Sequence, residues 1–248
     1  MFKRALGVTW FALRVTYEEF FALSGMGLIW FLAAVGLPLG VAGLTAQTLP
    51  WQVSMALTAV SLILAPPATA AIYHVAWYLA HERRIEFVYF WHGFKEYFGW
   101  SWKVAGVMLV VGAIVAADVL FFINAPAGFF KSVGLILMLW VLVFWVGIQV
   151  YLFPLMVALE EKRLVPMFKN SAQLVIAFPL FCLVMVLIAV LGTVLSVVLT
   201  LLLLSVWMPF IAILFSRAFA SSWEAAVRIQ QRHQEAVEQA EEEEPLEQ

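Results

Sequence analysis

The chain has 248 residues, of which 65% are hydrophobic and 12% are charged, and its formal net charge is −2. Soluble domains carry about 25% charged residues, so this composition excludes a soluble globular protein. The single cysteine, Cys182, excludes an intrachain disulfide and a metal site built from cysteines.

Long stretches with few or no charges dominate the sequence. A helix of roughly 20 apolar residues crosses a bilayer core about 30 Å thick, so these stretches predict membrane spans. Between Lys103 and Lys131 only Asp118 is charged. Three further stretches have no charged residue: those between Glu19 and Glu82, between Lys131 and Glu160, and between Lys169 and Arg217.

Polar and proline-marked breaks divide these stretches into six helices. Breaks of this kind lie at residues 46–50 and 124–131. The stretch 170–216 would be about 70 Å long as a single helix, so we expect a hairpin with its turn at residues 192–196. The predicted spans are 21–45, 52–80, 101–123, 132–159, 171–191 and 196–217.

Basic residues mark one side of the membrane. Thirteen of the fourteen Lys and Arg residues lie on the side opposite the three predicted turns, and only Lys131 lies on the turn side. Cytoplasmic loops of membrane proteins are enriched in Lys and Arg. We therefore expect a multi-pass protein of the cell (inner) membrane with both termini in the cytoplasm.

Two charged but aromatic segments, 5–21 and 86–102, flank the first and third spans. In the second segment, positions 87, 90, 91, 94 and 98 recur at helical spacing, which predicts an interfacial helix with an aromatic face. One interpretation is an aromatic belt that anchors the loop in the bilayer. The other is a surface for a partner, with these candidate contact residues: Phe90, Trp91, Phe94 and Lys95.

The C-terminal residues form a separate predicted unit. Ser221-Ser222-Trp223-Glu224 matches a capping box, which predicts the start of a cytoplasmic helix that reaches about Ala240. Six of the sixteen acidic residues lie in the last eleven positions, so we expect residues 241–248 to be a disordered acidic tail. The expected organisation is a transmembrane domain over residues 1–219 and a cytoplasmic helix with its tail over residues 220–248.

Asp118 is the only acidic residue inside a predicted span. A carboxylate in hydrocarbon costs several kcal/mol, and such residues usually face a bundle interior or water and serve a function. Asp118 also lies only about five residues, roughly 8 Å by helix rise, from the end of the third span. The alternative is therefore a carboxylate that simply reaches the interface.

Pro66, Pro67 and Thr69 lie midway along the second span. Two prolines remove two helical hydrogen bonds and bend the helix, and broken helices line the sites of many transporters. The alternative is a kink that serves packing alone. His74 and His81 can share a face of the same helix, but two imidazoles make a poor zinc site, so we interpret them as interfacial residues.

Motifs of catalysis are missing from the sequence. The segment His81-Glu82-Arg83-Arg84-Ile85 begins like the zinc-protease motif H-E-x-x-H, but Ile85 stands where the second zinc ligand must be. The chain has no G-x-S-x-G motif, no Walker A sequence and no pair of carboxylates inside a span. We therefore expect no enzymatic activity, no cofactor, no metal and no nucleic-acid partner.

Two short motifs resemble those of the YesL-like family of bacterial membrane proteins. Pro67-Ala68-Thr69-Ala70-Ala71 is similar to the family's G-P-A-T-A-A-type second helix, and Phe90-Trp91-x-x-Phe94-Lys95 is similar to its F-W-x-x-F-K-type loop. The resemblance covers residues 10–220, and Pro66 stands where the family pattern often has glycine. It implies a polytopic protein associated with carbohydrate uptake, and it implies no catalytic residues.

Two functions remain open at this point. The first is an accessory or regulatory membrane protein that contacts other membrane transport components through its cytoplasmic side. The second is a small-solute transporter or permease subunit that uses the kinked second span and Asp118. Permease subunits of ABC transporters usually carry an E-A-A-x-x-x-G loop, and neither 82–103 nor 159–170 contains one, which favours the first. The lipid bilayer is the expected partner in both cases, and the sequence leaves the oligomeric state open.

Overall fold

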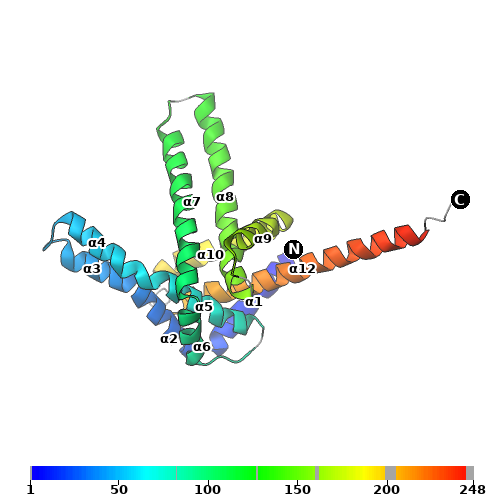
Figure 1. Ribbon diagram of the computed structural model, residues 1–248, viewed down its shortest axis with the longest axis horizontal. Helices are drawn as coiled ribbons and strands as arrows, with labels where there is room; N and C mark the ends of the chain where they lie inside the picture. The colour runs from blue at the N-terminus through cyan, green and yellow to red at the C-terminus, as the bar shows by residue number, and fades with distance from the viewer. Residues whose placement is uncertain (1, 82, 127, 160–161, 199–204, 244–248) are drawn as a thin grey trace.

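The computed structural model describes residues 2–81, 83–126, 128–159, 162–198 and 205–243. Every regular element in these ranges is a helix (Figure 1). Six stretches of the described chain are long and apolar enough to cross a membrane: Phe20–Thr45, Trp51–Ala80, Phe98–Asn124, Phe129–Ala158, Pro179–Ser196 and Trp207–Ala236. The prediction of an all-helical, multi-pass membrane protein is therefore confirmed.

The first two spans form a hairpin in which both helices are interrupted. The first span consists of α2 (Phe20–Phe31), a π-helical segment (Leu32–Gly36) and α3 (Leu37–Thr45), and the second of α4 (Trp51–Ser61), a 3₁₀ segment (Leu62–Leu64) and α5 (Ala65–Ala80). A proline lies just after each interruption, at Pro38 and Pro66. Because proline has no backbone N–H, the regular helical bonding pattern cannot run through these positions.

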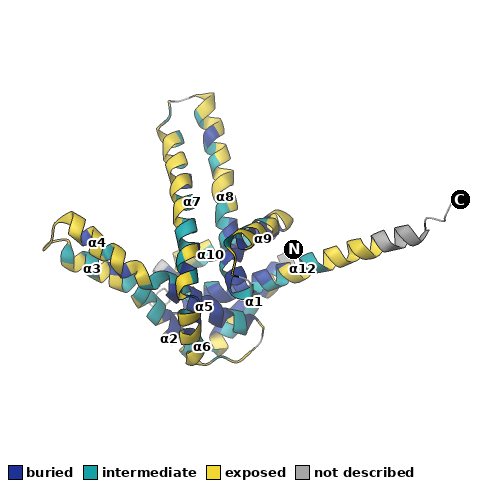
Figure 2. Cartoon of the chain, in the orientation of Figure 1, coloured by how far each residue is buried: buried dark blue, intermediate teal, exposed yellow. Residues whose placement is uncertain are grey.

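The third and fourth spans, α7 (Phe98–Asn124) and α8 (Phe129–Ala158), form a second hairpin. It projects from the rest of the molecule and is mostly exposed (Figures 1 and 2). Gly134 of α8 lies directly against the ring of Phe122 of α7. The missing side chain at Gly134 therefore allows the two helices to approach closely near their turn.

The fifth span differs from its prediction. Residues 164–177 form a separate helix, α9 (Leu164–Ala177), and the span itself is α10 (Pro179–Val198). The expected span 171–191 and the expected turn at 192–196 are therefore wrong, because α10 starts at Pro179 and continues through Gly192. Gly192 serves a helix contact instead, since the ring of Trp207 occupies the space of a Cβ there.

The sixth span continues without a break into the C-terminal region as α12 (Trp207–Glu243). The prediction that one helix ends near residue 217 and a second opens at Ser221 is therefore wrong. Ser221 and Ser222 lie inside α12, and their hydroxyls accept hydrogen bonds from the guanidinium of Arg4. Residues 244–248 of the expected acidic tail lie outside the described residues.

Two further short helices precede spans, as α9 does. The N-terminal segment is α1 (Phe2–Glu18), and the aromatic segment after the second span is α6 (Phe87–Glu96). The single helix expected over 86–102 is interrupted at Tyr97, where α6 ends and α7 begins. Helix α1 packs against α12 and α10, and α6 packs against α5.

The buried core lies at one end of the helices. This end holds α1, the α5–α6 connection and the α8–α9 connection, which together carry seven of the fourteen Lys and Arg residues of the chain, and we name it the basic end. Met26, Ile72, Leu152 and Ile213, which come from four different spans, are buried there. The α3–α4 and α7–α8 turns lie away from this core, on two mostly exposed hairpins that project in different directions (Figures 1 and 2), and these outer parts are together named the far end.

Candidate functional site

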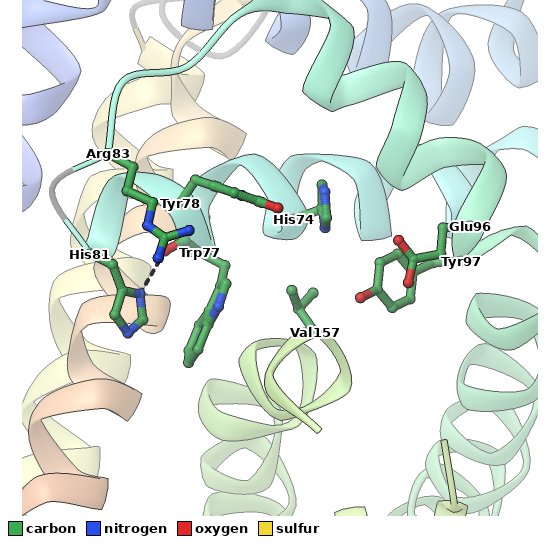
Figure 3. Close-up of a pocket in the computed structure, with 8 residues that line it drawn as sticks. All are labelled: His74, Trp77, Tyr78, His81, Arg83, Glu96, Tyr97 and Val157. Atoms are coloured by element: carbon green, nitrogen blue, oxygen red, sulfur yellow. Dashed lines mark hydrogen bonds between the residues drawn. The ribbon is translucent and has the colours of Figure 1, made fainter. Parts of the chain in front are cut away.

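A polar cavity of about 320 Å³ opens at the basic end, where α5, α6 and the ends of α7 and α8 meet (Figure 3). Its lining is His74, Trp77, Tyr78, His81, Arg83, Glu96, Tyr97 and Val157. Figure 3 shows Arg83 and Glu96 on opposite sides of this cavity, with His74 between them. The cavity thus offers a positive group, a negative group and an imidazole within one space.

His74 is a buried polar residue of this lining, with 5% of its surface exposed. Neither of its ring nitrogens has a hydrogen-bond partner among the described residues. Its ring lies 5.1 Å from that of Tyr78 and 5.6 Å from that of Tyr97, measured between centroids. Buried polar groups are almost always paired, so these two ring nitrogens, which have almost no exposed surface, are hydrogen-bonding capacity that the described residues leave unused.

Glu96 forms the acidic side of the cavity and joins two connections of the chain. Its carboxylate lies 3.1 Å from Nζ of Lys162 and 3.5 Å from Nε2 of His92. The Lys162 ammonium also lies 4.5 Å from the centre of the Tyr97 ring, a cation–π contact. Burial raises the pKa of the Tyr97 hydroxyl, with the negative charge of Glu96 acting in the same direction, so Tyr97 is neutral and able to donate a hydrogen bond.

The opposite wall is formed by the end of α5. Nδ1 of His81 lies 2.8 Å from the carbonyl oxygen of Trp77, and the two rings are 4.3 Å apart. The backbone N–H of Arg83 donates to the Tyr78 carbonyl at 3.1 Å, and the Arg83 guanidinium lies 5.9 Å from the Tyr78 ring centre. These contacts fix the chain as it leaves α5, so that Arg83 stays beside the cavity.

Gly93 explains how α6 is held against α5. A Cβ at this position would lie 2.7 Å from Cβ of His74, closer than carbon atoms can approach. Only glycine therefore permits this crossing, which closes the cavity around His74. Gly93 stands at one of the two unspecified positions of Phe90-Trp91-x-x-Phe94-Lys95, so its packing role does not account for the named residues of that motif.

The candidate interface residues divide between the core and the surface. Phe90 has 0% of its surface exposed, so it anchors α6 in the core and is not available to a partner. Trp91 and Lys95 are exposed, and Phe94 is half-buried with its ring edge-on to those of Trp91 and Phe98. Phe87, Trp91 and the half-buried Phe94 form an aromatic strip along α6, which Phe98 continues at the start of α7.

The proline break of the second span is stabilised by two tryptophans. Pro67 has no N–H for the carbonyl of Ile63, four residues earlier, and Nε1 of Trp102 from α7 donates to that oxygen at 3.1 Å. Nε1 of Trp30 from the first span donates to Oγ1 of Thr69 at 2.9 Å. The break is thus a bonded joint between three spans.

An apolar cavity of about 600 Å³ lies beside this joint, between the two hairpins. Pro66, Thr69, Trp102, Met108 and Phe153 are among the residues that line it. Its lining suits an apolar group and offers little to a polar solute. Pro67 is buried next to it, while His74 lies in the separate polar cavity.

Asp118 is not part of either cavity. It lies in the half of α7 nearer the far end and is exposed, and it forms no hydrogen bond or ion pair within the described chain. The structure thus brings Pro66 and Thr69 together and leaves Asp118 apart from them. The combined site of Asp118 and the kinked span is therefore not formed.

Sequence reasoning missed most of the polar cavity. His74 was a candidate, whereas Glu96, Tyr97 and the Lys162 that pairs with Glu96 were not. Lys162 belongs to a connection 66 residues away from Glu96 in the sequence. A usable signal was the adjacency of Glu96 and Tyr97 in the segment that follows the span containing His74. A pairing between two loops, however, is fixed only by the fold.

The described residues contain no group of three or more His, Cys, Asp and Glu side chains that could hold a metal ion. A comparison of the chain with protein-family models, with curated proteins and with solved structures found no match. The resemblance to the YesL-like family accordingly stays an expectation that rests on the two short motifs.

Proposed function

We propose that the protein is a non-enzymatic accessory or regulatory membrane protein that acts through partner contacts at its basic end, which the positive-inside rule assigns to the cytoplasm. The observation that carries this proposal is the concentration of polar structure at that end. The polar cavity around His74, the Glu96–Lys162 pair and the exposed strip of α6 all lie there. The far end offers two short turns and apolar helix surfaces.

The exposed strip of α6 is the proposed contact surface. Phe87 and Trp91 are each more than two-fifths exposed, and Lys95 lies beside them. Aromatic side chains are enriched at protein interfaces, and a short helix held rigidly by Gly93 presents them without a large cost in conformational entropy. Anchoring in the lipid headgroup layer is the competing use of the same strip.

The resemblance to YesL-like proteins suggests the kind of partner. On that resemblance alone, we propose a component of a carbohydrate-uptake system. The polar cavity supports a regulatory role, because a polar ligand bound between Arg83 and Glu96 would contact α5, α6 and α8 together and so alter the support of the α6 strip.

A second candidate function is a small-solute transporter. The observation that favours it is the broken second span, which lines the apolar cavity, since broken helices often line transport sites. The exposed position of Asp118, away from that cavity, weighs against a carboxylate-coupled mechanism.

The test combines crosslinking with reconstitution. A photoreactive amino acid at Trp91 is compared with one at Trp140, which is exposed on the far half of α8. We expect a membrane transport protein to be crosslinked in cells to the photoreactive residue at position 91 and not to the one at position 140. Purified protein is also placed alone in liposomes, and saturable solute uptake there would overturn the accessory role in favour of transport.

A further inference from the structure

Two adjoining grooves of about 410 and 470 Å³ lie between α1 and α12 at the basic end. Both are lined by Arg4, Ser221 and Glu224, so they form one continuous surface, named here the arginine groove. Five arginines line it: Arg4, Arg14, Arg217, Arg228 and Arg232. Glu224 is the one carboxylate in the described lining.

The arginines of α12 recur along one face of that helix. Arg217, Ser221, Arg228 and Arg232 are separated by four, seven and four residues, spacings that place them in one row. Because α12 is continuous from Trp207 to Glu243, this row is held straight. The groove thus places its positive charges on a rigid backbone.

Arg4 is tied to the groove by neutral partners. Its guanidinium donates to the hydroxyls of Ser221 and Ser222 and lies 4.6 Å from the centre of the Phe181 ring. Burial lowers the pKa of Arg4, and the nearby positive charge of Arg228 acts in the same direction. An anion in the groove would relieve this repulsion between like charges.

Arg217 is likewise placed by neutral groups. Its guanidinium donates to the Ala80 carbonyl at 2.8 Å and lies 4.4 Å from the Phe11 ring centre. Neither Arg4 nor Arg217 forms an ion pair with a carboxylate in the described part of the chain. These two half-buried guanidinium groups therefore face the groove without a direct carboxylate partner, and the charge of Glu224 acts on Arg4 only through space.

The other face of α1 indicates the depth of the groove in the membrane. Leu6, Trp10, Leu13 and Tyr17 are all at least half exposed and share one face of the helix, while Ala5, Val8 and Ala12 are buried on the opposite face. A helix with an exposed apolar row and basic edges lies in the bilayer interface. The groove is then level with the phosphate groups of the lipids on that side.

We propose that the arginine groove binds phosphate-bearing anions at the membrane surface, and that the headgroup of an anionic phospholipid is the ligand its position favours. Guanidinium groups bind phosphate oxygens through paired N–H donors. The leaflet at the basic end, if cytoplasmic, is also the more negatively charged one. This inference requires the membrane insertion of the spans and is independent of the proposed accessory role.

The test measures lipid binding to the full-length protein in detergent by native mass spectrometry. Phosphatidylglycerol and phosphatidylcholine are titrated separately, and inorganic pyrophosphate is added as a soluble competitor. The variant is Arg228→Gln/Arg232→Gln, because both side chains are exposed and their loss leaves the core intact. The matched control, Arg84→Gln/Lys169→Gln, removes two exposed positive charges outside the groove.

We expect the protein to prefer phosphatidylglycerol, and the groove variant to lose about 25-fold in apparent affinity if each surface arginine contributes about fivefold. The control should bind like the unaltered protein. Failure of pyrophosphate to compete supports the lipid headgroup as the ligand. Strong competition by pyrophosphate supports a phosphate site that is filled from solution. An equal loss in both double variants, or no loss in the groove variant, overturns the proposal.

Discussion

The third and sixth spans of the described chain differ in an instructive way. The most apolar window of α7 has only 6% of its residues buried in the protein, whereas the window of α12, the least apolar of the six spans, has 44% buried (Figure 2). In a soluble protein the most apolar helix would lie at the centre of the core. Here strong apolarity marks contact with lipid, while protein contacts also include small polar residues such as Ser101, Ser216 and Ser222, which are all buried.

The largest expected effect concerns the orientation of the two ends. In a Cys182→Ala background, single cysteines at Gln47 and Phe129 mark the far end, and one at Gln234 marks the basic end. With an impermeant thiol reagent on intact cells, we expect the first two to be labelled and the third to be protected, because the positive-inside rule predicts that the basic end faces the cytoplasm. Labelling at Gln234 alone would show that the protein has the opposite membrane orientation.

Glycine substitutions distinguish packing at the two ends. Gly93→Ala forces a Cβ to within 2.7 Å of the His74 Cβ at the basic end, and overpacking of this kind costs about 1–3 kcal/mol. We expect a clear drop in melting temperature in detergent. Gly99→Ala is the control, since no atom lies within 4 Å of the added group. Equal melting temperatures for the two variants would contradict the close α5–α6 contact.

At the far end, Gly134→Ala should cost less than Gly93→Ala. The added Cβ meets the ring of Phe122, but the hairpin around that ring is exposed and the ring has room to move. The measurement is the same melting experiment in detergent. A larger loss at Gly134 than at Gly93 would mean that the α7–α8 turn is packed as firmly as the basic end.

The bonded joint at the proline break of the second span is tested by a substitution of Trp102. Trp102→Phe removes the donor to the Ile63 carbonyl, and a hydrogen bond within a protein contributes about 0.5–1.5 kcal/mol. Pro67→Ala restores a backbone N–H to that carbonyl, so we expect Trp102→Phe to cost less in the Pro67→Ala background. A double-mutant cycle of unfolding free energies measures this coupling. Additive effects would show that the indole and the missing proline donor are unrelated.

The smallest effect is expected from the Glu96–Lys162 pair. Both side chains are about one-third exposed, and pairs in this setting contribute about 0–1 kcal/mol. Glu96→Gln should therefore lower stability slightly at low salt, and the difference should shrink in high salt. Glu86→Gln, an exposed carboxylate without a described ion pair, is the control. A large, salt-independent loss would indicate that Glu96 is supported by more than this pairing.

The sequence alone predicts the six-span, all-helical fold well, because hydropathy records the lipid environment of each helix directly. It predicts helix ends poorly where a residue type is common both at helix ends and at contacts between helices. Gly192 indicated a turn but accommodates the ring of Trp207, and Ser221 matched a helix cap but binds Arg4 within a continuous helix. Local sequence does not record which distant helix packs against these positions.

The candidate sites show the same division. The prolines of the second span were recognised from sequence, because the loss of a backbone donor is a local property. The indoles of Trp30 and Trp102 that bond to this break, however, come from residues 39 positions away on either side. Contacts of that range depend on how the spans are arranged, so the break was predictable and its support was not.

The unbroken α12 has a mechanical consequence. Its 37 residues correspond to a rod of about 55 Å, with one end packed against Gly192 and the other projecting away from the body (Figure 1). Because no joint separates the two parts, a twist or tilt applied to the projecting part is transmitted to the part inside the membrane. A partner that binds the projecting part of α12, well outside the bilayer, would therefore exert a torque on the sixth span.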